Sequence, residues 1–450
     1  MQDASAQSSL YRAVWRWHFY AGLCVLPFLL LLAVTGALYL FKPEIDHALY
    51  RDMIDVPARA SSPAPISTSV LDVERALDGR VEQVTLPDRP DRSLRLLVRV
   101  ASGGPRTAFA DPYDGRFLGS TPAGGAMQLI RKVHSLQYFG FWASSLIEIA
   151  AGWGIVLIGT GVFLWWPRGQ GSGVVTVAGS PRTRRFWRDL HSVTGVFSAA
   201  VILFLAVTGM PWSKFWGDHV QQWATAANLN MPAPPADVTP GWMLTEAMPG
   251  MNHAPHADNE VRATMPWAVD RAPVPQSRSG RTEDIGIDAA VARFEALGLR
   301  RPFNVQPPEG PRGAYVGSFT PDQVTRERTV YLGRDGEVLG DVGYRDYGVV
   351  AKAIEWGIQV HQGQEYGAAN RYVMLAGCVA IVVLVLSGAT MWWKRRPKGR
   401  LAAPPADRRS VWAVGAVIVV GGVIFPLVGM SLLMALACDW TWRRAIGRVR

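Results

Sequence analysis

The chain has 450 residues, of which 49% are apolar and only 18% are charged, and it contains 31 prolines. This mixture argues against a purely soluble protein and predicts membrane spans that alternate with sizeable polar segments. The net charge of +10 does not indicate nucleic-acid binding, because the basic residues gather beside the apolar runs and form no stripe or binding motif. All three cysteines lie inside apolar runs, so no disulfide framework is expected.

Five apolar runs are long enough to cross about 30 Å of hydrocarbon as helices. They cover residues 14–41, 140–166, 192–212, 370–393 and 411–440. Arginine and lysine residues gather before the first run, between the second and third, and between the fourth and fifth. Because positive residues favour the cytoplasmic side, residues 42–133 and 213–360 should lie outside. The first run is too long for a signal-peptide core, so we expect an uncleaved anchor with a cytoplasmic N-terminus.

The two outer segments each predict a small α+β unit. In the first, a helix at residues 68–80 precedes strands at 94–100 and 107–110. In the second, a helix at 287–298 precedes a strand at 328–332. The expected fold is therefore an α-helical membrane protein, an internally duplicated bundle of about five transmembrane helices with two small α+β periplasmic units.

The predicted segments follow one another along the chain. They are the N-terminus with the first span (1–41), the first outer unit (42–133), the second span (134–166), a basic cytoplasmic loop (167–190), the third span (191–212), an irregular outer extension (213–283), the second outer unit (284–360), the fourth span (361–393), a second basic loop (394–410), the fifth span (411–440) and a basic tail (441–450). The fifth span has no duplicate, and a single crossing would leave the basic tail outside. Its topology therefore stays open.

The first four spans form an internal repeat. His18, Gly22, Thr35 and Gly36 recur with the same spacing as His191, Gly195, Thr208 and Gly209. His134, Gln137, Gly140, Gly161 and Trp165 recur, again with the same spacing, as His361, Gln364, Gly367, Gly388 and Trp392. Each half is therefore a span, an outer segment and a second span.

Four of the eight histidines lie at or within the ends of these spans, at repeat-matched positions. An ionisable side chain at membrane depth is costly and usually faces the bundle interior with a partner. Taken singly, each is more typical of a structural histidine, but recurrence as two matched pairs favours a ligand role. Internal symmetry pairs His18 with His191 near the cytoplasmic face, and His134 with His361 near the outer face.

Paired imidazoles on facing helices suit a six-coordinate haem iron that transfers electrons. Gly22 and Gly195 lie one helical turn after His18 and His191, where a missing side chain would leave room for a flat macrocycle. Zinc would favour three or four compact ligands. The chain has no CxxCH motif, so the expected cofactor is haem b that is not covalently attached. We expect two haems, one with His18 and His191 as axial ligands of its iron and the other with His134 and His361.

Several motifs together resemble the bacterial PepSY-associated transmembrane proteins. They are the WRWH and WRDLH openings, the VTG triplets, the H-xx-Q-xx-G starts, the WW-basic ends and the DG-x-x-LG turns. The resemblance covers roughly residues 10–395, and the long extension after the third span departs from it. It implies PepSY modules at 64–120 and 284–341, haem ligation by the four matched histidines, and a bacterial inner-membrane reductase of ferric siderophores in iron uptake.

The electron donor stays open between a membrane quinol and a cytoplasmic reductase, because the chain has neither a GxGxxG nor a GxxxxGK[ST] fingerprint. Two other classes remain as alternatives. One is a permease in which histidines relay protons between two rocking halves, and the other is an interaction protein that uses its outer units without redox activity. His47 and His219 lie outside the repeat pairs and are more typical of helix-end polar residues than of groups that orient ligands or bind substrate. His253 and His256 could contact a metal, although loop histidines usually do not, so a contribution of these four to a site stays open.

Overall fold

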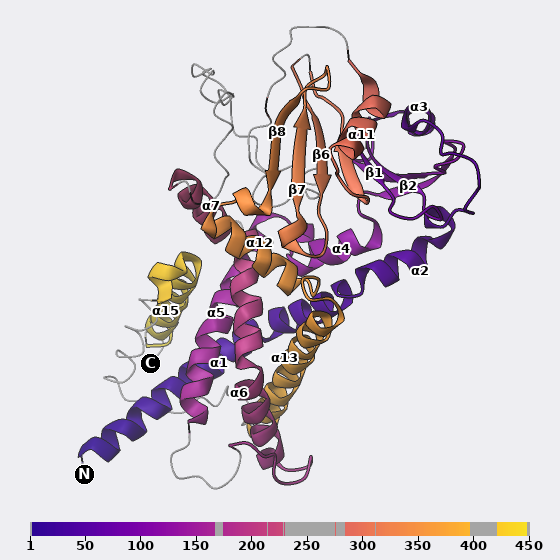
Figure 1. Cartoon of the computed structure of the whole chain (residues 1–450). Helices are drawn as coiled ribbons and strands as arrows, with labels where there is room; N and C mark the ends of the chain where they lie inside the picture. The colour runs from indigo at the N-terminus through magenta and orange to yellow at the C-terminus, as the bar shows by residue number, and fades with distance from the viewer. Residues whose placement is uncertain are drawn as a thin grey trace.

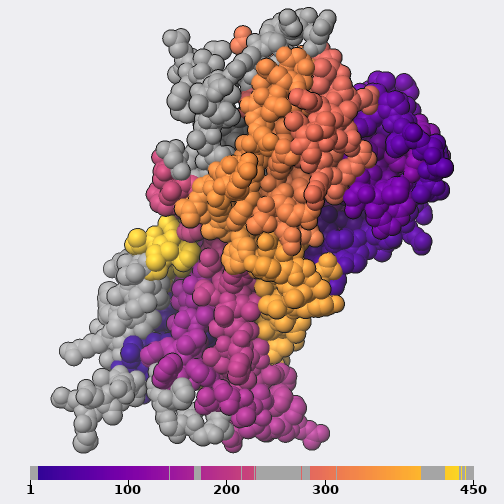
Figure 2. Space-filling model, in the orientation of Figure 1, coloured from indigo at the N-terminus to yellow at the C-terminus, as the bar shows by residue number. Residues whose placement is uncertain are grey.

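The computed structural model describes residues 2–166, 174–213, 215–227, 229, 275, 284–310, 312–396 and 421–447. Within them the chain has two parts, a bundle of long helices and a β-sheet domain at one end of the bundle (Figure 1). In the space-filling view, the first half of the sheet domain, in indigo, and the second half, in orange, form one continuous body above the bundle (Figure 2).

Four helices of the described residues are long and apolar enough to cross a membrane. They are α1 (Gln2–Tyr39), α5 (Phe141–Trp165), α6 (Arg184–Gly209) and α13 (Gly367–Arg395). α1 and α6 each pack against both α5 and α13, so α1 and α6 lie diagonally opposite each other in the bundle. The chain is therefore a membrane protein with a helical part, as the hydropathy pattern predicts.

The predicted fifth span, 411–440, lies partly outside the described residues. Its described part is not one straight helix, because α15 (Pro426–Gly447) begins after a sharp turn. A Cβ atom on Gly422 would come within 2.8 Å of the Gly429 Cα, which shows that the chain reverses between them. Pro426 has no amide hydrogen to continue the preceding helix. α15 then packs on α5, where the Trp153 indole donates to Ser431 Oγ at 3.0 Å.

The predicted segments 134–166 and 361–393 each begin before the membrane helix that they contain, whereas the apolar runs 140–166 and 370–393 start within three residues of α5 and α13. His134 ends a separate helix, α4 (Gly125–His134), and His361 ends α12 (Val349–His361). The membrane helices α5 and α13 start only after a turn, at which Gly140 has φ 93° and Gly367 has φ 62°. Glycine adopts these left-handed conformations without steric cost, so each glycine allows the chain to change direction there. The predicted spans 134–166 and 361–393 each therefore combine two helices.

The two outer units are joined in one antiparallel sheet of eight strands, in the order β4-β3-β2-β1-β5-β6-β7-β8. The strands are β1 (Gly79–Leu86), β2 (Leu94–Val100), β3 (Arg106–Ala110), β4 (Phe117–Pro122), β5 (Phe303–Gln306), β6 (Tyr315–Phe319), β7 (Arg328–Leu332) and β8 (Val338–Gly343). β1 and β5 form the seam, with Val84 opposite Val305 and Leu86 opposite Phe303. The sheet thus belongs to both halves of the chain.

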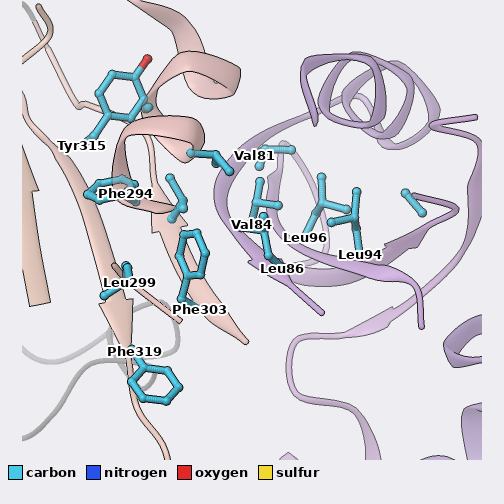
Figure 3. Packing of buried hydrophobic residues seen from close by; sticks show 14 of the residues in the cluster. Val81, Val84, Leu86, Leu94, Leu96, Phe294, Leu299, Phe303, Tyr315 and Phe319 are labelled. Atoms are coloured by element: carbon cyan, nitrogen blue, oxygen red, sulfur yellow. The ribbon is translucent and has the colours of Figure 1, made fainter. Parts of the chain in front are cut away.

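One hydrophobic core spans this seam. α3 (Ile66–Leu77) and α11 (Gly286–Ala296) contact each other, and both halves of the sheet contribute to the apolar cluster with which they pack. Figure 3 shows Val84 and Leu96 of the first half in the same cluster as Phe294 and Phe303 of the second. On the first half, α2 (Lys42–Ile54) extends from α1 toward the sheet and contacts β3 and β4.

Asp288 links the two units at this core. Its carboxylate accepts hydrogen bonds from the Ile66 N–H at 2.6 Å, the Ser67 N–H at 3.2 Å and the Ser67 hydroxyl at 2.5 Å, all at the start of α3. Because these donors lose their partner in Asp288→Ala, we expect the free energy of unfolding of the sheet domain to fall by about 1–2 kcal/mol. Thermal unfolding of the full chain in detergent measures this.

Glu295→Ala is the control, because Glu295 forms only an exposed pair with Arg301. Surface pairs of this kind contribute about 0–1 kcal/mol. Equal stability losses in the two variants would show that Asp288 does not link the units.

Candidate functional site

The structure brings the four repeat-matched histidines together as two pairs. His18 on α1 and His191 on α6 form the distal pair, at the end of the bundle away from the sheet. Their ring centroids are 6.4 Å apart and their planes are nearly perpendicular, at 88°. A metal ion bonded at about 2.0–2.1 Å to one nitrogen of each ring would hold such centroids about 6 Å apart. The observed separation therefore leaves room for one ion between the rings.

His134 and His361 form the sheet-side pair. Burial lowers the pKa of both imidazoles to about 4. At this end of the bundle, Leu40 just after α1 and Val360 just before His361 lie in one apolar cluster. The charge of His134 also contributes to lowering the pKa of His361. Both rings are consequently neutral at pH 7, which is the form of histidine that binds metals.

Each of the four rings meets a hydroxyl group on a neighbouring helix through its Nδ1 atom. The pairs are His18 with Thr160 at 2.9 Å, His134 with Thr35 at 2.8 Å, His191 with Ser387 at 3.0 Å, and His361 with Thr208 at 2.8 Å. The partners Thr35 and Thr160 lie on α1 and α5, and Thr208 and Ser387 lie on α6 and α13. One arrangement thus occurs four times.

These hydroxyls fix the tautomer of each ring. Each one donates its only hydrogen to the carbonyl oxygen four residues earlier in its own helix, at 2.6 to 2.8 Å. The hydroxyl must therefore accept from the imidazole, so Nδ1 carries the hydrogen. For His191 the Leu384 carbonyl oxygen, at 3.1 Å from Nδ1, requires the same assignment. The Nε2 lone pair of every ring stays available, as in metal sites whose histidines are oriented by a second hydrogen bond.

A glycine follows each hydroxyl residue and lies against the imidazole. A Cβ atom added to the glycine would lie close to the ring carbon Cε1 of the histidine. The distance between these two atoms would be 3.5 Å at Gly36, 3.3 Å at Gly161, 3.6 Å at Gly209 and 3.6 Å at Gly388. A longer side chain would occupy the place of the ring. Each histidine is thus held by a Ser/Thr-Gly pair of another helix. The repeat includes these glycines, but their role as partners of the histidines appears only in the structure.

Gly22 and Gly195 do not touch an imidazole in the described structure. A Cβ atom on Gly22 would meet the Leu157 side chain at 3.9 Å, and one on Gly195 would meet Leu384 at 3.5 Å. Both are ordinary van der Waals contacts with flexible side chains. The expectation that these two glycines leave room for a macrocycle stays a prediction.

The other histidines do not join either pair. His47 Nε2 lies 3.0 Å from both oxygens of the Asp55 carboxylate. His219 on α7 (Trp216–Ala226) donates from Nδ1 to the Phe215 carbonyl oxygen at 2.7 Å. His253 and His256 lie outside the described residues. Across the part of the chain that the structure describes, no group of three or more His, Cys, Asp or Glu side chains has an arrangement that could hold a metal ion. A pair of histidines suits a metal that takes two axial ligands from the protein, as haem iron does, better than it suits zinc, which takes three or four protein ligands.

No curated protein matches the sequence. The family model of the PepSY-associated TM region matches residues 15–395, which include all four membrane helices from Trp15 onward, both halves of the sheet and the four paired histidines. The chain therefore belongs to the PepSY-associated transmembrane family.

Proposed function

We propose that the four histidines hold two b-type haems, and that the chain is a membrane reductase that passes electrons across a bacterial inner membrane to a ferric chelate outside, such as a ferric siderophore. The observation that carries this proposal is the fourfold arrangement in which a hydroxyl fixes Nδ1 and leaves Nε2 available. Two bis-histidine haems would supply one-electron transfer at these positions.

The residues present fit such a group. Both rings of each pair are oriented by a second hydrogen bond, which raises the basicity of a ligating imidazole and limits its rotation. The two pairs also lie at opposite ends of the bundle. α1 carries His18 near one end and Thr35, the partner of His134, near the other, and 17 helical residues cover about 25 Å. This separation suits electron transfer between the two faces of a membrane.

Basic and aromatic residues at the distal end support the proposed orientation. Arg396 lies over the Trp393 ring at 3.4 Å, and Arg395 lies over the Trp15 ring at 4.1 Å. Tryptophan is typical of either membrane interface, and arginine is enriched on the cytoplasmic side. The distal pair would then face the donor, a quinol or a cytoplasmic reductase, and the sheet would lie in the periplasm with the acceptor. Reduction of ferric iron weakens its binding by hard oxygen ligands, which would release it from the chelator.

The hydrogen bonds of the pairs do not favour the alternative of a histidine proton relay. Each Nδ1 hydrogen bond ends on a hydroxyl that donates to a helix carbonyl, and this chain of bonds stops at the backbone. Such an arrangement stabilises one tautomer, whereas a relay needs rings that exchange protons at both nitrogens.

Absorption spectra of the purified chain test the proposal. We expect protein from haem-replete cells to contain two b-type haems per chain, with the sharp reduced bands of six-coordinate iron after dithionite treatment. Mixing the reduced protein with a ferric siderophore under anaerobic conditions should reoxidise it and yield ferrous iron. A folded but colourless protein would refute haem binding, and a coloured protein that no ferric chelate reoxidises would refute the substrate.

A further inference from the structure

Three glutamates are buried together where the second half of the sheet meets α12. Glu327 precedes β7, Glu355 lies on α12, and Glu365 lies in the turn before α13, with exposed fractions of 3%, 2% and 7%. Both Glu355 and Glu365 act on the Glu327 carboxyl as neighbouring negative charges. We call Glu327, Glu355 and Glu365 the carboxylate cluster. Like charges at such depth cannot all be ionised without a compensating charge or proton.

Several buried polar atoms around the cluster have no hydrogen-bond partner. They are Glu327 Oε2, Thr329 Oγ1, the Tyr347 hydroxyl and Gln359 Oε1. Thr329 is 0% and Tyr347 3% exposed, so water at the surface does not satisfy them. Buried polar atoms are almost always paired, and an unpaired group costs about 1–3 kcal/mol. Two of these atoms, Glu327 Oε2 and Gln359 Oε1, are acceptors without a donor, and a hydrogen on the Glu327 carboxyl would supply one.

The electrostatics of the described residues favour a neutral Glu327. Burial, followed by the charges of Glu355 and Glu365, raises the pKa of Glu327 to about 9, and only a hydrogen bond from Gln359 opposes this. Two phenols face the cluster, Tyr344 in η4 (Tyr344–Asp346) and Tyr347 after it. Beside these phenols lie Tyr331, Asp346 and Tyr366. These groups are phenols and one further carboxylate, and none of them is a cation.

The cluster has no counterpart in the first half of the chain. In the repeat alignment that relates His134 to His361, Gln128 stands in place of Glu355 and Tyr138 in place of Glu365. The Gln128 side chain accepts from Arg131 Nε at 2.8 Å instead. The cluster therefore breaks the internal symmetry on the helix that also carries His361. Glu355 precedes His361 on α12 by six residues, which is about 9 Å along the helix.

We propose that Glu327, together with Glu355 and Glu365, forms a proton-binding site whose occupancy is linked to the electron on the sheet-side histidine pair. At a pH near the pKa of about 9 of Glu327, where part of the carboxyl is ionised, one electron added at that pair is accompanied by one proton from the outer solution, which forms the O–H bond of the carboxylic acid. Oxidation releases both. The electron half of this linkage rests on the proposed function, whereas the proton site itself does not.

The size and sign of the linkage follow from electrostatics. A unit charge about 10 Å away shifts a pKa by about one unit at an effective dielectric constant of about 20. The extra electron favours the protonated acid, so Glu327 should bind its proton more tightly in the reduced protein. The tighter proton binding stabilises the reduced state at low pH, and this stabilisation is lost once the pH rises above the pKa of Glu327 in both redox states. The midpoint potential of the sheet-side pair should then fall by about 59 mV in total for a pKa difference of one unit.

Infrared spectroscopy of the purified full chain tests the proton site whether or not haem is bound. We expect a carboxylic-acid C=O band at pH 7 that titrates with a midpoint near the pKa of about 9 of Glu327, and we expect Glu327→Gln to remove it. Glu82→Gln is the matched control, since Glu82 on β1 has a side chain only 8% exposed and pairs with Arg99. A band that persists in Glu327→Gln, or the absence of an acid band at pH 7 in the unmodified chain, would overturn the proposal.

Redox titration between pH 6 and 10 tests the linkage. The unmodified chain and Glu82→Gln should show the fall in midpoint potential, and Glu327→Gln should not. A protein without haem would refute the proposed function but leave the infrared result standing, while a pH-independent potential in the unmodified chain would refute the linkage alone. Should Glu327→Gln fail to fold, Glu355→Gln serves instead. It removes a neighbouring negative charge and should move the C=O titration to lower pH, and an unmoved titration would contradict the cluster.

Discussion

His361→Ala is expected to remove the six-coordinate signature of one haem and to leave the other unchanged, and His134→Ala is expected to remove the same signature. These two rings form the sheet-side pair, so either variant leaves one iron with a single axial ligand. His18→Ala and His191→Ala should both affect the other haem, because their ring centroids face each other at 6.4 Å. Reduced-minus-oxidised spectra and haem content per chain measure all four variants.

His219→Ala is the control for these variants. Its ring donates a hydrogen bond to the Phe215 carbonyl oxygen and lies tilted against the Phe215 ring, away from both pairs, so both haem signatures should persist. The pairing would be wrong if His18→Ala and His134→Ala abolished one and the same signature.

The membrane part and the histidine pairs could be predicted from sequence because both depend on patterns along the chain. Hydropathy predicts the four long helices that the structure describes. The internal repeat relates His18 to His191, and in a protein built of two similar halves, repeat-matched residues meet near the axis that relates them. The facing rings of the distal pair agree with this pairing.

The partners of the histidines could not be predicted, because they lie on other helices. Thr160 is 142 residues from His18, and no local pattern reveals which helices become neighbours. The joining of the two outer units could not be predicted for a related reason. β5 has only four residues, and the first three are buried, so it shows no alternation of polar and apolar positions. The carboxylate cluster likewise brings together glutamates that are far apart in sequence.

Gly161→Leu is expected to lower the haem content of the distal pair about tenfold or more. The His18 ring lies 3.3 Å from the place of a Gly161 Cβ atom, so a leucine side chain would displace the imidazole. Overpacking of a fitted contact costs about 1–3 kcal/mol, which is about five- to 150-fold in an equilibrium. Gly388→Leu should have the same effect through His191. The sheet-side signature should remain in both variants, because the other two glycines serve that pair.

Gly159→Leu is the matched control, since Gly159 lies two residues earlier on α5 and has nothing within 4 Å of a built Cβ atom. It adds the same side chain to the same helix, so loss of the distal signature in this variant as well would indicate a general effect on α5. A graded series sharpens the test. Gly388→Ala places Cβ at an ordinary contact distance of 3.6 Å from the His191 ring and should keep most of the haem. Full retention in Gly388→Leu would mean that the imidazoles are not held against these glycines.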